Sequence, residues 1–363
     1  MNLTEKFKRI KPRENSGSVA SNRFDFQKNW AICKLIELTN SNVDFLLAFE
    51  YHEDIIVLDS VNNPTQIDFY QIKTKDKGSY SLKNILTRKK LKNGDGGSIL
   101  GKLYQNKLHF EVETNSLNIV SNTKFNIKSI QENKLIICCN ELHEDEKVEI
   151  ENCLKSELSI EWLQDFFNII FLHTSELTIE HHNEITKDKL NRLIETRYNA
   201  HVKYNPSLAY RTIFDEVNRR NNLEREIQSF DELINFKSIS KADFEAMLKI
   251  VVSEPDKLDL LKNKLFNLLD AEKINLSLRK KYLEAWKDVQ IQYLSLSNDF
   301  FNQCVEVIKK VIEENIEQLD GNLLESLDKL YKALLNQKII QKQQIYSEYF
   351  LKMVILKEIY HEE

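Results

Sequence analysis

Glycine divides this chain of 363 residues into two parts that suit different kinds of fold. Six of its seven glycines lie in the first 101 residues, and Gly321 follows much later. Glycine supplies the positive-φ positions that tight turns require. The first part therefore suits strands joined by turns, whereas the remainder suits helices joined by short connections.

The first part combines helical and strand spacing. Phe26, Trp30 and Cys33 recur at intervals of three or four residues, which predicts a helix over about 23–38. We expect strands over 45–49, 55–58, 67–74, 117–122 and 135–139, a turn at 62–64, a basic helix over 79–92, a loop over 93–97 and a helix over 99–106. The first 140 residues should therefore be mixed α/β around a central sheet.

Beyond residue 147 helical spacing dominates, and Pro206 and Pro255 are natural boundaries. Helices are predicted over 147–169, 183–200, 207–222, 240–252, 256–270, 275–293, 298–319 and 322–360. We expect four regions: a polar leader over 1–20, an α/β domain over 21–145, a helical linker region over 146–255 and a helical bundle over 256–363. The abundance of Leu and Ile in the last region favours oligomerisation or partner docking.

The composition excludes several classes of protein. The net charge of -5 shows no overall basic character, so any surface that binds nucleic acid has to be local. Five cysteines without CxxC spacing argue against a disulfide framework or a zinc site. Residues 1–20 lack the apolar core of a signal peptide, and no long uncharged apolar run occurs. We expect a soluble, cytoplasmic protein that does not enter a membrane.

A carboxylate, an amide and an amine lie where two paired strands can bring them together. Asp54 closes the segment Glu50-Tyr51-His52-Glu53-Asp54, and Gln71-Ile72-Lys73 follows on the next predicted strand. With the turn centred near Asn63, antiparallel pairing places Asp54 opposite Ile72 or Lys73. Gln71 and Lys73 are two residues apart and therefore project from the same face of a strand.

This trio suits metal-assisted hydrolysis of a phosphodiester. Asp54 is a hard oxygen ligand of the kind that Mg²⁺ prefers, and Gln71 can add its neutral amide oxygen. Lys73 can orient the attacking water and stabilise the charge that develops on the phosphate. From spacing alone, two ordinary half-buried strands with exposed polar residues remain the alternative interpretation.

A basic segment follows directly from the second strand. Residues 70–107 contain ten Lys and Arg residues against Asp76 and Asp95, a local charge of +8. Such residues neutralise phosphates, so we expect DNA contacts here. The candidates nearest the trio are Lys75, Lys77, Lys83, Arg88, Lys89 and Lys90. A solvated charged surface is the alternative, and no base-reading motif is visible.

The order of these pieces resembles the PD-(D/E)xK superfamily, in which a leading helix precedes a carboxylate on one strand and (Asp/Glu/Gln)-x-Lys on the next. Residues 17–125 are similar to the double-stranded-DNA endonuclease domain of CD-NTase-associated and Lamassu anti-phage effectors. The matching segments are Gly17, Phe24-Asp25-Phe26-Gln27, Glu50-Tyr51-His52-Glu53-Asp54, Gln71-Ile72-Lys73, Ser98-Ile99-Leu100-Gly101-Lys102-Leu103-Tyr104 and Val120-Ser121-Asn122. The whole chain most resembles the nuclease subunit of Lamassu systems.

The resemblance implies an α/β restriction-endonuclease-like N-terminal domain followed by an all-α C-terminal region. It implies that Asp54 is the metal-binding carboxylate, Gln71 the variable acidic or amide position and Lys73 the catalytic lysine. Gln27 matches a recurrent family residue on the leading helix. Glu50 is a further candidate metal ligand, with a solvated strand-edge charge as the alternative. Because Gln71 carries one negative charge fewer than an acid, the number of metal ions stays open.

The function that the resemblance implies is Mg²⁺-dependent cutting of double-stranded DNA as the effector of an anti-phage system, with Mn²⁺ able to substitute. An SMC-like ATPase and an accessory subunit would restrain the nuclease until its release and assembly into a homo-oligomer, such as a tetramer. The alternative is a catalytically decayed DNA-binding or assembly subunit. A helical scaffold that the first domain merely anchors is a third interpretation.

Overall fold

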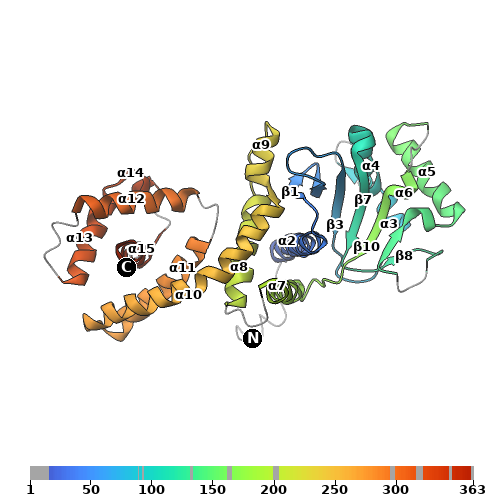
Figure 1. The fold of residues 1–363 in the computed structure, drawn as a ribbon. Helices are drawn as coiled ribbons and strands as arrows, with labels where there is room; N and C mark the ends of the chain where they lie inside the picture. The colour runs from blue at the N-terminus through green and yellow to red at the C-terminus, as the bar shows by residue number, and fades with distance from the viewer. Residues whose placement is uncertain are drawn as a thin grey trace, which may run out of the picture. The chain divides into compact units, whose positions relative to one another are not determined.

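The computed structural model describes residues 16–88, 90–91, 94–130, 134–161, 166–198, 204–294, 299–315, 322–342 and 346–360. They form two compact units, coloured along the chain in Figure 1. The first unit takes residues up to 193 together with 217–244. The second unit takes residues 194–216 and the chain from 245 onward.

A seven-stranded sheet forms the centre of the first unit. Its strands are β1 (Leu46–Tyr51), β2 (Glu53–Leu58), β3 (Ile67–Lys73), β7 (Thr114–Ser121), β9 (Ile136–Cys138), β10 (Ile170–Thr174) and β11 (Ser238–Ser240), in the order β11-β1-β2-β3-β7-β10-β9. β3 lies at the middle of this order, antiparallel to β2 and parallel to β7. Because both its edges are hydrogen-bonded, its register is fixed on two sides.

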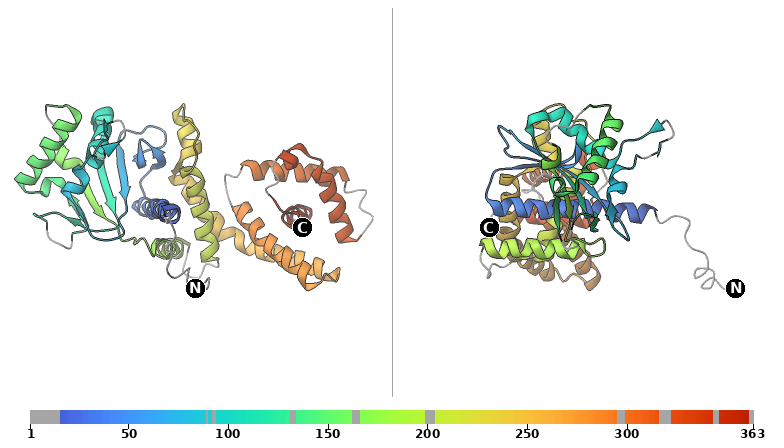
Figure 2. Two further views of the ribbon diagram at one scale, coloured as in Figure 1. Left: turned by 180° about the vertical axis from the view of Figure 1, so that it is seen from behind. Right: turned by 90° about the vertical axis from the view of Figure 1, so that its right-hand side faces the viewer.

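Helices cover the two faces of the sheet (Figure 1). On one face α2 (Ser16–Ser41) lies beside α7 (His182–Tyr198), as the side view in Figure 2 shows. Hydrogen bonds from Asn29 to His182 and Asn183 join these two helices. The opposite face carries α3 (Leu82–Leu86), α4 (Ile99–Phe110), α5 (Glu144–Leu158) and α6 (Phe166–Ile169). The sheet is thus buried between two helical layers, as expected for an α/β domain.

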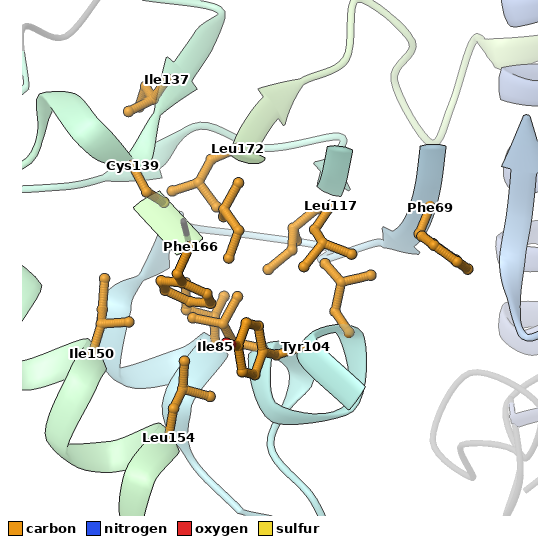
Figure 3. Close-up of a cluster of buried hydrophobic side chains, with 14 of the residues drawn as sticks. Phe69, Ile85, Tyr104, Leu117, Ile137, Cys139, Ile150, Leu154, Phe166 and Leu172 are labelled. Atoms are coloured by element: carbon orange, nitrogen blue, oxygen red, sulfur yellow. The ribbon is translucent and has the colours of Figure 1, made fainter. Parts of the chain in front are cut away.

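The apolar core beneath α3, α4 and α5 draws on residues far apart in sequence (Figure 3). Phe69 and Leu117 contribute to it from β3 and β7, and Leu172 from β10. Tyr104 on α4 packs edge-to-face on Phe166, with ring centroids 4.8 Å apart. Alternation along β3 places Ile67 and Phe69 on this face, so Gln71 and Lys73 continue the same face beyond the core.

Several short elements complete the first unit. They are β4 (Tyr80–Ser81), β5 (Lys90–Leu91), β6 (Gly94–Asp95), η1 (Glu111–Glu113), β8 (Phe125–Asn126), η2 (Cys139–Glu141), α9 (Phe230–Glu232) and the π-helical turn η3 (Leu233–Lys237). α8 (Pro206–Asn221) ends in this unit, where Arg220 donates hydrogen bonds to the carbonyl groups of Ile234, Asn235 and Ser238. These bonds hold η3 against the start of β11.

The second unit is helical throughout the residues described. α10 (Lys241–Ala271), most of whose length lies here, is followed by α11 (Leu276–Leu294), α12 (Asp299–Asn315), α13 (Leu323–Leu335), α14 (Lys338–Lys342) and α15 (Glu348–Tyr360). α15 packs against α11, α12 and α13, and every residue from Phe350 to Lys357 is buried. No helix within the described ranges has both the length and the apolar character that a membrane span needs.

The expected fold class is confirmed: a mixed α/β domain precedes an all-helical C-terminal region. The expectation of helices alone beyond residue 147 was wrong at β10 and β11. Apart from Ser240, both strands lie in gaps between the predicted helices: β10 pairs with β7 and β9, and β11 pairs with β1, so long-range pairing extends the sheet into this part of the chain. The basic helix expected over 79–92 was also too long, since only Leu82–Leu86 is helical among the residues described there. Extended pairs of residues flank it.

Candidate active site

A tight corner between β1 and β2 brings two carboxylates together. Tyr51 pairs with Glu53, so the chain reverses over His52 alone. Glu50 and His52 both adopt positive φ, at 46° and 64°, which is uncommon for residues other than glycine. Phe49 pairs with Ile55, and this register sets Glu50 beside Asp54. Strained positions of this kind concentrate at functional sites.

β3 brings the predicted trio to this corner. Ile55 pairs with Tyr70, so Asp54 falls opposite Gln71, one residue from the nearer of the two positions expected. The backbone N–H of Ile72 donates to Asp54 Oδ2 over 2.6 Å. Lys73 Nζ lies 3.8 Å from the same oxygen, and Gln71 Nε2 lies 3.5 Å from it. The amide, the amine and the carboxylate therefore share one small volume.

Gln27 reaches the corner from α2. Its Nε2 donates to Glu50 Oε1 over 2.7 Å and approaches the backbone carbonyl of Asp54 at 3.5 Å. One buried amide thus contacts both sides of the corner and orients the Glu50 carboxylate. Of the two interpretations of Glu50, this geometry favours a positioned carboxylate over a solvated strand-edge charge.

Three further residues adjoin the site without having been singled out from the sequence. Asn106 on α4 donates to Glu53 Oε1 over 3.0 Å. Lys237, at the end of η3, donates from Nζ to the backbone carbonyl of Glu50 over 3.4 Å. Glu53 stands inside the segment already noted, but Lys237 comes from 187 residues downstream. No local pattern signals such a contact, because it depends on the pairing of β11 with β1.

Burial and mutual repulsion control the protonation of the carboxylates. Burial, with the Asp54 charge adding to it, raises the pKa of Glu53 to about 7. Burial likewise raises the pKa of Glu50, although the Gln27 hydrogen bond opposes the shift. Burial lowers the pKa of the Lys237 ammonium, and the nearby Glu50 carboxylate opposes that change. The site therefore concentrates negative charge that a cation would relieve.

The donor atoms suit a hard divalent cation. Asp54 and Glu50 offer carboxylate oxygens, and Gln71 offers an amide oxygen. Among the residues described, no three His, Cys, Asp or Glu side chains gather closely enough to hold a metal by themselves. A site with one or two carboxylates, a neutral oxygen and room for water matches Mg²⁺, which keeps several of its waters.

The six residues predicted to contact DNA have different surroundings. Lys77 and Lys83 are exposed. Lys75 Nζ donates to the carbonyl of Ser79 and lies 5.1 Å from the centre of the Tyr80 ring. Arg88 Nε lies 3.8 Å from Glu157 Oε2. Lys89 and the side chain of Lys90 lie outside the described residues. Of the four whose side chains the structure describes, Lys77 and Lys83 are thus the two that are exposed to solvent.

Two comparisons with known proteins find sequences similar to this chain. The family model described as "Cap4, dsDNA endonuclease domain" matches residues 15–221. The Lamassu protein LmuA of Bacillus cereus (strain VD014) is 26% identical over 243 residues, which cover 65% of this chain and 64% of that protein. The chain thus spans slightly less than two thirds of the length of this relative. Both matches confirm the resemblance inferred from the order of the sequence segments.

Proposed function

Because this chain belongs to the Cap4 dsDNA endonuclease domain family, we propose that it is a metal-dependent DNA endonuclease. The observation that carries the proposal is the position of Lys73 Nζ, 3.8 Å from Asp54 Oδ2 on adjacent strands. Gln71 shares the face of Lys73. An amine beside a metal-binding carboxylate suits phosphodiester hydrolysis, because the amine can stabilise the charge that develops on the phosphate.

Each side chain has a definite role in this reaction. Asp54, Gln71 and Glu50 would hold Mg²⁺, or Mn²⁺ in its place. When bound, the cation polarises the phosphoryl oxygen and lowers the pKa of a water molecule. Lys73 orients the attacking water and stabilises the charge that develops on the phosphate. Ile72 keeps Asp54 in place through its backbone N–H, and Gln27 does the same for Glu50.

The basic residues would hold the DNA backbone. Lys77 and Lys83 are exposed on the segment that leaves β3, so phosphates of a bound duplex can reach them. Lys75, Arg88, Lys89 and Lys90 complete the proposed contacts. Such contacts position DNA without reading its sequence, and binding should weaken steeply as salt rises.

The similarity to LmuA supports a role as the effector of an anti-phage system. In this proposal an SMC-like ATPase and an accessory subunit restrain the nuclease in the cytoplasm, and release lets it assemble into a homo-oligomer. The helices of 256–363 would supply the contacts, with 1–20 as a leader and 146–255 as a connecting region. Light scattering of the chain alone and with its genomic neighbours tests this. A strictly monomeric, unregulated nuclease would contradict it.

One variant separates catalysis from mere binding. Lys73→Ala should reduce plasmid cleavage in Mg²⁺ or Mn²⁺ by roughly a hundredfold or more, because the charge on the phosphate loses its partner. Lys128→Ala, which changes an exposed lysine outside the proposed metal, DNA-contact and oligomerisation residues, is the matched control. Equal cutting by Lys73→Ala and the unmodified protein would refute the catalytic assignment.

The amide at position 71 favours one alternative, a decayed site that binds DNA without cutting it. Gln71→Glu restores the acidic form of the motif and should tighten metal binding in an active enzyme. If the unmodified protein binds DNA but never nicks it with either metal, the decayed site is the correct interpretation.

A further inference from the structure

A pocket of about 450 Å³ opens beside the β1–β2 corner. The corner contributes Tyr51 and His52, the end of α4 contributes Phe110, and the first residue of α9 contributes Phe230. This volume falls within the range of small-ligand sites. All the lining residues belong to the first unit.

The pocket lies on the same face of the sheet as Gln71 and Lys73. Ile67 lines it, and the Phe69 ring packs on Phe110 with centroids 5.3 Å apart. Gln71 and Lys73 follow on that face at two-residue spacing. The strand rise places Ile67 roughly 13 Å from Gln71, which is about four nucleotide steps along a duplex strand.

α4 provides a second connection between the pocket and the site. Asn106 donates to Glu53, and Phe110, one helical turn later, lines the pocket. The His52 ring packs edge-to-face on Phe110, with centroids 5.0 Å apart. His52 itself stands between Glu50 and Asp54 in the chain. A group seated here would therefore lie next to the catalytic corner.

The lining selects a flat, uncharged ring with a polar edge. Aromatic rings surround the pocket, and Gln66 and Gln228 supply amides that can both donate and accept hydrogen bonds. None of the fifteen described residues that line it is Lys or Arg, and Glu113 contributes a carboxylate, so the pocket does not favour a phosphate. Phe230 is 39% exposed, which leaves a stacking surface open to solvent.

We propose that this pocket receives a nucleobase of the DNA strand that is being cut. The proposal rests on the proposed endonuclease function and adds to it a preference for one base near the cleavage point. Aromatic side chains hold bases by stacking, and amides read their edges. The backbone phosphates of the same strand stay outside the pocket, where Lys73 and the exposed lysines can meet them.

Sequencing the DNA ends that the enzyme produces tests the preference. The unmodified protein should favour one base within about four nucleotides of the cut. Phe230→Ala should abolish this preference and lower kcat/KM roughly tenfold, through loss of stacking. His52→Asn should act in the same direction, because asparagine tolerates the positive φ but lacks the ring. Leu108→Ala, a control of matched exposure at 41%, should change neither quantity.

A binding experiment in the Lys73→Ala background distinguishes a base within DNA from a free nucleoside as the ligand of the pocket. The fluorescence of 2-aminopurine at the preferred position should change when Ca²⁺-loaded protein binds the DNA, and Phe230→Ala should abolish that change. This readout needs no cutting. The signal from protein with an intact pocket shows whether a base enters it, even where a pocket variant is unstable. Binding of free adenosine or thymidine in place of the base within DNA would overturn the proposal.

Failure of the pocket proposal can be distinguished from failure of the proposed endonuclease function. Cleavage without any base preference, and without a fluorescence change, overturns the pocket proposal and leaves the nuclease intact. Absence of cleavage by the unmodified protein with either metal overturns the endonuclease function first.

Discussion

Gln27 Nε2 lies 2.7 Å from Glu50 Oε1, and this hydrogen bond joins α2 to the β1–β2 corner of the candidate site. The same amide approaches the carbonyl of Asp54. Gln27→Leu keeps the bulk of the side chain and removes the donor, so Glu50 should lose its orientation. We expect the Mg²⁺ concentration that half-saturates cleavage to rise roughly tenfold, as for other residues that orient metal ligands.

Calorimetric titration with Ca²⁺ measures the change in metal affinity of Gln27→Leu without catalysis. Gln105→Leu, which alters an exposed glutamine on α4, should leave the metal titration unchanged. An unaltered titration in Gln27→Leu would show that Glu50 does not need this hydrogen bond.

Gly101 should resist substitution because of one carboxylate. A Cβ at this position would clash with Glu157 Oε1, and that oxygen accepts a hydrogen bond of 2.7 Å from the Ser98 N–H. Gly101→Ala should lower the free energy of unfolding by about 1–3 kcal/mol, as overpacking does. Urea denaturation measures the loss.

A double-mutant cycle identifies the cause. In a Glu157→Ala background the clash is gone, and Gly101→Ala should become neutral or stabilising by about 0.5–1 kcal/mol, since alanine favours a helix interior. An equal loss in both backgrounds would assign the effect to something other than Glu157.

Stability should fall as the pH drops from about 6.5 to 4, because of His173. Its Nε2 lies 2.8 Å from Asn118 Oδ1, and burial lowers the pKa of its imidazole to about 4. The unfolded chain, with a histidine pKa near 6.5, binds the proton first, so acid favours unfolding in this window. Between pH 7.5 and 5 this residue should cost about 2 kcal/mol.

Urea denaturation at both pH values measures the effect. His173→Gln should reduce the pH dependence, whereas His181→Gln, at an exposed histidine, should preserve it. The same slope in His173→Gln and the unmodified protein would assign the acid sensitivity to other groups.

The second unit should depend on α15. Leu356 is fully buried, and replacing it with alanine removes methyl groups and leaves a cavity. Leu356→Ala should destabilise this unit by about 2–5 kcal/mol. Hydrogen exchange should show faster exchange in α11 and α13, with β3 unaffected. Leu276→Ala, at a side chain that is 86% exposed, should have almost no effect.

Local patterns predicted much of the fold. The glycine contrast separated the α/β part from the helical part, and the apolar runs located β1, β2, β3 and β7. The meeting of Asp54 with Gln71 and Lys73 was also predictable, because one short turn joins their strands. The register differed by one residue, since the sequence marks the turn but not which residues pair across it.

The pairing of strands that lie far apart in the chain could not be predicted from the sequence. β11 is a three-residue strand whose partner, β1, lies about 190 residues earlier, and nothing in Ser238-Ile239-Ser240 announces it. Lys237 and Asn106 reach the site only through such packing. β10 lies in the gap between the helices predicted over 147–169 and 183–200, where no strand was predicted, and its place in the sheet depends on pairing with β7 and β9.

The edge strand β11 has a consequence for the order in which the protein is made. A ribosome completes β1, β2 and β3 early, but the ammonium group beside Glu50 and the strand that closes the sheet come only with residues 237–240. The match to the family model ends at residue 221. A nascent chain of that length carries Asp54, Gln71 and Lys73 without β11 and Lys237, so the candidate site is complete only after residue 240 has been made.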